Sequence, residues 1–190
     1  MGLDMYLTKE TFIGNKYRKQ AHLVKVVMPN SQKGEFPLVK NIETKRVSTI
    51  IEEIGYWRKA NAIHKWFVDN VQNGEDDCKK YRVSKEQLEE LLGVVNKVLD
   101  NSKLVKGKIT NGHNIKKVKG QLERVPIKED GKYIKDTSMA IMLLPMQKGF
   151  FFGSDEYNQW YVEDLKDTKE ILESAIKEYG TGDVYYQSSW

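Results

Sequence analysis

The sequence predicts an α+β fold in which an antiparallel β-sheet packs with about three helices and carries a basic β-hairpin insertion. Short β-branched stretches bounded by turn residues predict strands, and apolar residues at helical spacing predict helices. A chain of 190 residues is long enough for one hydrophobic core, so we expect residues 1–190 to form a single domain.

Three stretches in the first third of the chain are typical of strands. Residues 2–7 alternate, and residues 22–29 are β-branched and end at a proline. Residues 46–54 contain the run Val-Ser-Thr-Ile-Ile, which favours a strand, whereas Thr49 with Glu52 could form a helical capping box; we prefer the strand. A turn is expected over 30–37.

The last third predicts three more strands. The run MAIMLLP (139–145) is continuous and apolar, which indicates a central strand, and GFFFGS (149–154) is expected to be its hairpin partner. The segment DVYYQSSW (183–190) is expected to return as an edge strand.

Three helices are expected. The first runs from about Trp57 to Val71 and stops near Gly74, which tolerates the left-handed conformation. The second, over 83–99, is the clearest, because it opens with a Ser-x-x-Gln capping box and continues with leucines and valines at helical spacing. The third begins after a Ser154 cap and ends at Gly180.

Charge is distributed unevenly along the chain. Segment 103–135 holds ten Lys/Arg against three acids, while segment 150–183 holds three Lys against nine acids. The basic segment also contains Asn111-Gly112 and Asp130-Gly131, dipeptides typical of tight hairpin turns, so we expect one or two basic hairpins within 103–136. Either these segments are two solvated faces that attract each other, or the basic one is an arm that faces an anion.

Composition excludes several classes of protein. No apolar run approaches the ~20 residues that span a bilayer, and the first residues lack the pattern of a signal peptide. One cysteine, Cys78, rules out an intrachain disulfide and fits a reducing compartment, so we expect a cytoplasmic protein without a membrane partner. The net charge of +4 does not by itself indicate a nucleic-acid binder.

The stretch YWRKANAIHKWFV (56–68) suggests a binding surface. On a helix, an apolar arc grades through Trp57, Asn61 and His64 to the cations Arg58 and Lys65. An indole can stack on a flat base, a carboxamide can read an amide or base edge, and the cations can hold phosphate or carboxylate oxygens. The alternative is that this aromatic stripe is core packing.

A second aromatic-polar cluster lies at 149–161, where Phe151, Tyr157 and Trp160 are expected to face the same ligand. Motifs for dinucleotide, P-loop, zinc-protease or nucleophile-elbow chemistry are absent from the sequence, and neither a cofactor nor a metal is expected. If the protein is an enzyme, His64 is the candidate acid-base group, with Asp155 or Glu156 as its partner.

Four blocks together carry a family resemblance: MGLDMYL, YWRKANAIHKWFVDNVQ, GFFFGS with the following Y..WY.EDL, and YQSSW. They resemble a family of uncharacterised small proteins of phages, prophages and bacteria, and the basic segment 103–135 has no counterpart in that resemblance. Small phage proteins often inhibit host defence, some by sequestering nucleotide-derived signals. The resemblance itself implies origin and not chemistry; by analogy with those inhibitors, the protein is expected to act in the bacterial host cell as an anti-defence sponge.

These observations leave three hypotheses. The first is a binding protein for a small anionic, nucleotide-like ligand held between the 57–65 stripe and the 150–161 segment. The second is an enzyme acting on a nucleotide or other phosphorylated substrate through His64. The third is a nucleic-acid or protein-binding module that uses the basic hairpins, which we rank below the other two. The opposite charge blocks and the aromatic C-terminus also suggest a homo-oligomer.

Overall fold

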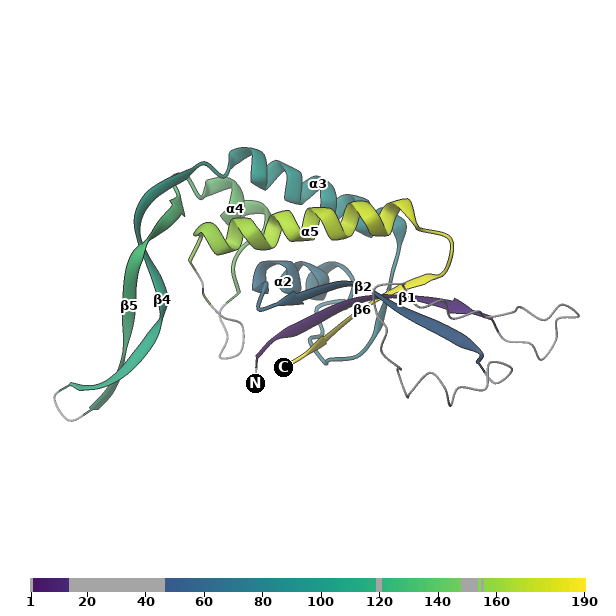
Figure 1. Cartoon of the computed structure of the whole chain (residues 1–190), viewed down its shortest axis with the longest axis horizontal. Coiled ribbons are helices and arrows are strands. Elements are labelled where there is room, and N and C mark those ends of the chain that lie inside the picture. The colour runs from purple at the N-terminus through teal and green to yellow at the C-terminus, as the bar shows by residue number, and fades with distance from the viewer. Residues whose placement is uncertain (1, 14–46, 119–120, 148–153, 155) are drawn as a thin grey trace, which may run out of the picture.

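The protein is a four-stranded antiparallel sheet covered on one face by helices, with a long two-stranded arm at one end (Figure 1). The computed structural model describes residues 2–13, 47–118, 121–147, 154 and 156–190. Two sheets and four described helices confirm the predicted α+β class. The strand expected at 22–29 and the turn at 30–37 lie outside the described residues. None of the described helices is long and apolar enough to cross a membrane.

The main sheet has the strand order β2-β1-β6-β3. Its strands are β1 (Asp4–Phe12), β2 (Thr49–Arg58), β3 (Tyr81–Val83) and β6 (Asp183–Ser189). The strands predicted at 2–7 and 46–54 are therefore confirmed. The expectation that the C-terminal segment is an edge strand is wrong, because β6 pairs with β1 on one side and β3 on the other.

Alternation along the strands separates a covered face from an open one. Met5 and Leu7 of β1 and Tyr186 of β6 are fully buried under the helices, whereas Tyr6 and Tyr185 point the other way and are half-buried. Two helices lie on the covered side. Thr168 of the helix at 159–177 accepts a hydrogen bond from Trp57 of β2, and Phe67 of the helix at 61–70 stacks on Tyr186.

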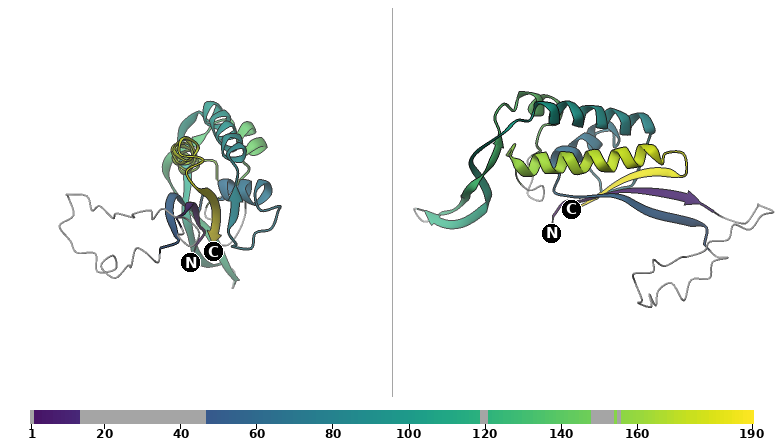
Figure 2. Two further views of the ribbon diagram at one scale, coloured as in Figure 1. Left: turned by 90° about the vertical axis from the view of Figure 1, so that its right-hand side faces the viewer. Right: turned by 45° about the horizontal axis from the view of Figure 1, so that its top comes forward.

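The four described helices are α2 (Asn61–Asn70), α3 (Lys85–Asn101), α4 (Ser138–Leu143) and α5 (Gln159–Lys177). The helix α3 confirms the prediction, including the capping box: Ser84 Oγ accepts from the backbone N–H of Gln87, and the Gln87 side chain accepts from the N–H of Ser84. Its buried stripe packs against α5, which runs alongside it (Figure 2).

The predicted start of the first helix is wrong. Trp57 and Arg58 belong to β2, because pairing with β1 continues through Gly55 as far as Arg58, opposite Asp4. A β-bulge between Leu7 and Thr8 shifts the register of this pairing. The chain turns at Lys59, whose φ is 62°, and α2 begins only at Asn61. Gly74 takes the expected positive φ, 82°, after the helix.

Two further predictions near the C-terminal half are wrong. The run 139–145 forms the short helix α4 rather than a central strand, with Ile141 and Met142 exposed and Ala140 buried. Helix α5 is capped by Asn158, whose Oδ1 accepts from the N–H of Trp160, and not by Ser154. The expected partner strand at 149–154 lies almost wholly outside the described residues.

The basic segment forms one hairpin, the arm, made of β4 (Leu104–Val118) and β5 (Gln121–Ile134). Both predicted turns are wrong, because Asn111-Gly112 sits at a bulge inside β4 and Asp130-Gly131 lies within β5. Gly112 still uses its freedom there, with a φ of 86°. The arm leaves the body near the start of α5 and extends away from it (Figures 1 and 2).

Candidate functional site

Trp57, the first residue of the predicted ligand stripe, is part of the core. Its side chain is 3% exposed, its Nε1–H donates to Thr168 Oγ1 of α5 at 2.9 Å, and its ring lies 6.0 Å from that of Phe67. An indole enclosed in this way has no open face on which a base can stack.

Asn61 joins two segments of the chain to α2. It is 2% exposed, its Nδ2 donates to the carbonyl of Ser154 at 2.8 Å, and its Oδ1 accepts from the backbone N–H of Gln147 at 3.1 Å. The buried side chain thus pairs with backbone groups on both flanks of the segment 148–153.

His64 lies at the centre of a buried chain of hydrogen bonds. The imidazole has no exposed surface; its Nδ1 lies 2.7 Å from the hydroxyl of Tyr186 and its Nε2 lies 2.9 Å from Asp76 Oδ2. Asp76 Oδ1 in turn accepts from Nε1–H of Trp190 at 3.0 Å. A carboxylate only accepts, so Nε2–H of the neutral imidazole donates to Asp76, and Nδ1 accepts from the hydroxyl of Tyr186. Burial raises the pKa of Tyr186 well above its ordinary value, so the phenol keeps the proton that it donates.

This chain of four side chains links α2, the loop before β3 and the C-terminal strand. Of the two predicted partners for His64, Glu156 binds the arm, and Asp155 lies outside the described residues. The arrangement is suited to fixing the C-terminus rather than to moving protons to a substrate.

The two cations of the predicted stripe do not face the same way as its aromatic residue. Arg58 is opposite Asp4 on the open face of the sheet, with its Nε 3.9 Å from Asp4 Oδ1, whereas Trp57 points to the covered face. Lys65 pairs with Asp69 one turn along α2, at 2.6 Å. Arg58 and Lys65 are thus surface groups on separate elements.

Of the second predicted cluster, Phe151 lies outside the described residues. Tyr157 is half-buried, accepts from the N–H of Met146 at 3.0 Å and has its ring 5.0 Å from that of Tyr161. Trp160 is half-buried at the start of α5. The structure does not bring these rings and the α2 residues together around an open cleft among the residues it describes.

Among the described carboxyl groups, the one whose pKa is shifted most belongs to Asp164, a residue that the sequence analysis did not single out. Burial, together with the neighbouring charges of Asp167 and Glu163, raises the pKa of Asp164 on α5 to about 7. The sequence gives no signal for it, since Asp164 is one of several acids on a charged helix. A perturbed carboxyl marks a candidate site only when other groups converge on it. Nothing described around Asp164 forms such a set, so we assign it no role.

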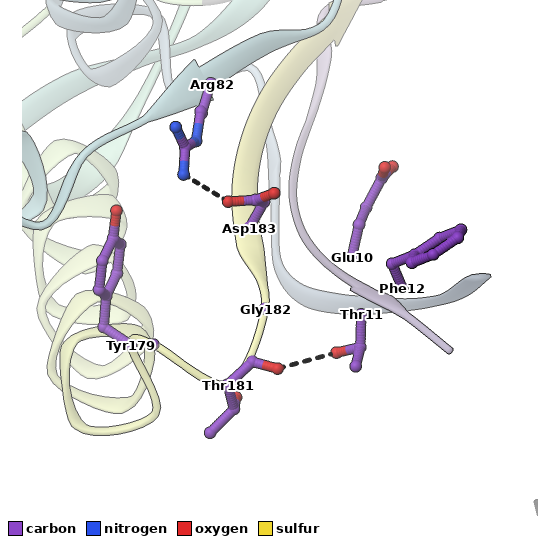
Figure 3. A pocket seen from close by; sticks show the side chains of 9 residues that line it. Glu10, Thr11, Phe12, Arg82, Tyr179, Thr181, Gly182 and Asp183 are labelled. Carbon is purple, nitrogen blue, oxygen red and sulfur yellow. Dashed lines mark hydrogen bonds and ion pairs between the residues drawn. The ribbon is translucent and has the colours of Figure 1, made fainter. Parts of the chain in front are cut away.

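A shallow depression of about 390 Å³ lies where β1 and β3 approach the turn before β6 (Figure 3). Its cation is already neutralised, because Arg82 Nη2 lies 2.5 Å from Asp183 Oδ1, and Thr11 Oγ1 donates to the carbonyl of Thr181 at 3.2 Å. An exposed ion pair and a satisfied hydroxyl offer neither a free anion site nor a nucleophile with its base.

The base of the arm is attached firmly to the body by Glu156. This carboxylate accepts from the backbone N–H of Thr110 at 2.8 Å, from the Thr110 hydroxyl, and from Lys128 Nζ at 3.0 Å. Burial alone would raise the pKa of Glu156, but the hydrogen bonds from Thr110 and Lys128 outweigh it and hold the pKa below its usual value. Further along, the N–H of Lys132 donates to Gln159 Oε1 at 3.0 Å.

Beyond the bulge, most of the described residues of the arm are exposed. Every residue from 111 to 117 is exposed, including Lys116 and Lys117. Nearer the body, Lys106 and Lys132 sit directly opposite each other in the ladder, and both are exposed. The arm therefore combines a fixed base with an accessible cationic surface, which makes it the strongest candidate interface of the described chain.

No family model, curated protein or solved structure matches this chain. The resemblance to small phage proteins stays a prediction. Function must therefore be argued from the geometry of the arm and the body.

Among the described residues, no three His, Cys, Asp or Glu side chains gather as a metal-binding group requires. Trp57, Asn61 and His64, which were predicted to bind a ligand, form hydrogen bonds within the protein.

Proposed function

We propose that the protein binds double-stranded DNA through the arm β4–β5. The observation that carries the proposal is the charge of the arm: residues 104–134 hold eight Lys/Arg against three acids, in a chain whose net charge is only +4. Phosphate contacts from lysine and arginine supply most of the affinity of non-specific binding to DNA.

The cross-strand pair Lys106–Lys132 supports an anion as the partner. Like charges directly opposite each other destabilise an antiparallel pair, and neither lysine has a carboxylate partner among the described residues. The next pair along the same face, Lys108 and Asp130, is an ion pair at 2.9 Å. A phosphate group between Lys106 and Lys132 would relieve their repulsion.

The dimensions of the arm favour a B-form duplex. A two-stranded ribbon can enter a groove of B-DNA, major or minor, whereas the major groove of A-form RNA is too narrow for side chains to read. At ~3.4 Å per residue, the 15 residues of β4 extend roughly 50 Å, more than one helical turn of DNA.

Binding of a fluorescent 30-base-pair duplex, followed by anisotropy between 50 and 300 mM KCl, tests the proposal. The variant Lys116→Gln/Lys117→Gln should bind about tenfold less tightly per lost contact near 0.1 M salt, and its salt slope should be shallower by roughly 0.9 per contact. The control Lys166→Gln/Lys177→Gln removes the same charge from exposed positions on α5 and should bind like the wild type. Equal weakening in both variants, or no binding by the wild type, would overturn the proposal.

The small-ligand and enzyme hypotheses remain predictions, because residues on which they rely are buried in the described part of the chain. A small nucleotide-like ligand would need an opening beside Trp57, Asn61 and His64, and these side chains are 3%, 2% and 0% exposed. An enzyme acting through His64 would need access to the same buried imidazole. A role against host defence rests on the resemblance alone.

A further inference from the structure

The distal half of the arm carries two strongly exposed apolar side chains. Leu122 is 76% and Ile115 is 70% exposed, the two highest values among the large hydrophobic residues that the structure describes. Both lie beyond the bulge at Asn111-Gly112, where the arm has left the body.

The register places both side chains on one face of the ribbon. Ile115 is opposite residue 124 and Leu122 is opposite Lys117, so they are diagonal neighbours, with Cβ atoms within roughly 7–8 Å. Lys117 shares that face and Lys116 points to the other. The result is a small aliphatic tip within a cationic ribbon.

We propose that Ile115 and Leu122 enter the minor groove of bound DNA and partly separate two stacked base pairs, which kinks the duplex. This inference rests on the proposed function, because the cations of the arm bring it to the phosphates. A stack of base pairs is the apolar interior that DNA offers, and inserted isoleucine or leucine wedges kink duplexes by roughly 20–90°.

A second copy of the chain is the competing occupant, through its acidic helix α5. Opposite charge would favour that contact, but among the described residues α5 exposes no large hydrophobic side chain against which Ile115 and Leu122 could pack. The aliphatic tip therefore fits the base stack better than the acidic helix.

Bending is measured by energy transfer between dyes at the two ends of a 30-base-pair duplex with central TA steps, which kink easily. Wild-type protein should raise the transfer efficiency at saturation. The variant Ile115→Ser/Leu122→Ser should still bind, with an unchanged salt slope, but the rise in transfer should be lost. The control Ile51→Ser changes another exposed aliphatic residue, 61% exposed on β2, and should bend DNA like the wild type.

The outcomes separate the two proposals. Binding with equal bending by wild type and the double serine variant overturns the wedge and leaves the DNA-binding arm standing. Absence of binding by the wild type overturns both. Sedimentation of the protein without DNA tests the competitor: a dimer that the double serine variant converts to monomer would overturn the wedge in favour of a contact between copies.

Discussion

The substitution Tyr186→Phe isolates one hydrogen bond in the core. Its ring stacks on Phe67 with centroids 4.0 Å apart and planes 6° from parallel, and a phenylalanine ring keeps that contact. What is lost is the hydroxyl that lies 2.7 Å from Nδ1 of His64. Because both residues are fully buried, water cannot replace the lost donor.

The expected cost follows from the unsatisfied acceptor. A buried polar group left without its partner costs about 1–3 kcal/mol of stability. For a chain of 190 residues each kcal/mol lowers the melting temperature by roughly 2–4 °C. Phenylalanine is more apolar than tyrosine, so we expect a value in the lower half of the range.

Urea unfolding followed by circular dichroism measures this cost, with an unchanged m-value as the sign that only stability has changed. The control is Tyr185→Phe, on the neighbouring position of β6 but on the open face. Its hydroxyl makes no hydrogen bond in the described part of the chain, so the change should stay within about 0.5 kcal/mol. If Tyr186→Phe also leaves the free energy of unfolding unchanged, the hydrogen bond between Tyr186 and His64 does not hold the imidazole, and His64 is again a candidate reactive group.

Three further predictions follow from the site. Because burial raises the pKa of Asp164 to about 7, the charged carboxylate destabilises the fold above that pH. The variant Asp164→Asn should therefore add on the order of 1–3 kcal/mol to the free energy of unfolding at pH 8 and nothing at pH 4. A gain that does not depend on pH would contradict this. Because hydrogen bonds lower the pKa of Glu156, the stability that its carboxylate contributes is complete above pH 4.5 and is lost as the pH falls through the lower pKa of the folded protein. The variant Glu156→Gln should therefore speed hydrogen exchange of the Thr110 amide at pH 7. Unchanged exchange would show that the carboxylate does not anchor the arm. Cyclic and linear nucleotides at 1 mM should leave the melting temperature unchanged, since the α2 stripe is closed; a nucleotide that binds with a Kd of about 10 µM would add roughly 2.7 kcal/mol and restore the small-ligand hypothesis.

Sequence patterns predicted the elements whose local signals agree with their surroundings. The capping box at Ser84 and the leucines that follow it fix α3 without help from the rest of the chain. The alternation at 2–7 fits β1 because that strand has one covered and one open face.

Where tertiary pairing decided the outcome, local patterns were insufficient. A continuous apolar run does not distinguish a buried strand from a short helix, and 139–145 became α4. Asn111-Gly112 has turn chemistry, yet the ladder on both sides of it turned that chemistry into a bulge. Trp57 was placed on a helix because nothing local reveals that β1 extends β2 as far as Arg58.

The candidate site divides in the same way. The composition of 56–68 correctly marked a dense set of rings and polar groups, but the partners that close it, Thr168, Asp76 and Tyr186, are distant in the sequence. The basic hairpin was predicted from its charge and from two turn dipeptides, and the charge was the more reliable signal because neither dipeptide forms the turn. Its attachment through Glu156 could not be predicted, since it depends on where α5 begins.

Shortening the arm tests the central claim most directly. Residues 112–126 are removed and the strands rejoined through an Asn-Gly turn, which leaves the contacts of Glu156 with Thr110 and Lys128 in place. Anisotropy with the 30-base-pair duplex should then show at least a hundredfold loss of affinity at about 0.1 M salt, as expected for two or more lost phosphate contacts, while the melting temperature stays near that of the full chain. Affinity that survives the loss of the distal arm would contradict the account and place the DNA-binding surface, if there is one, on the body.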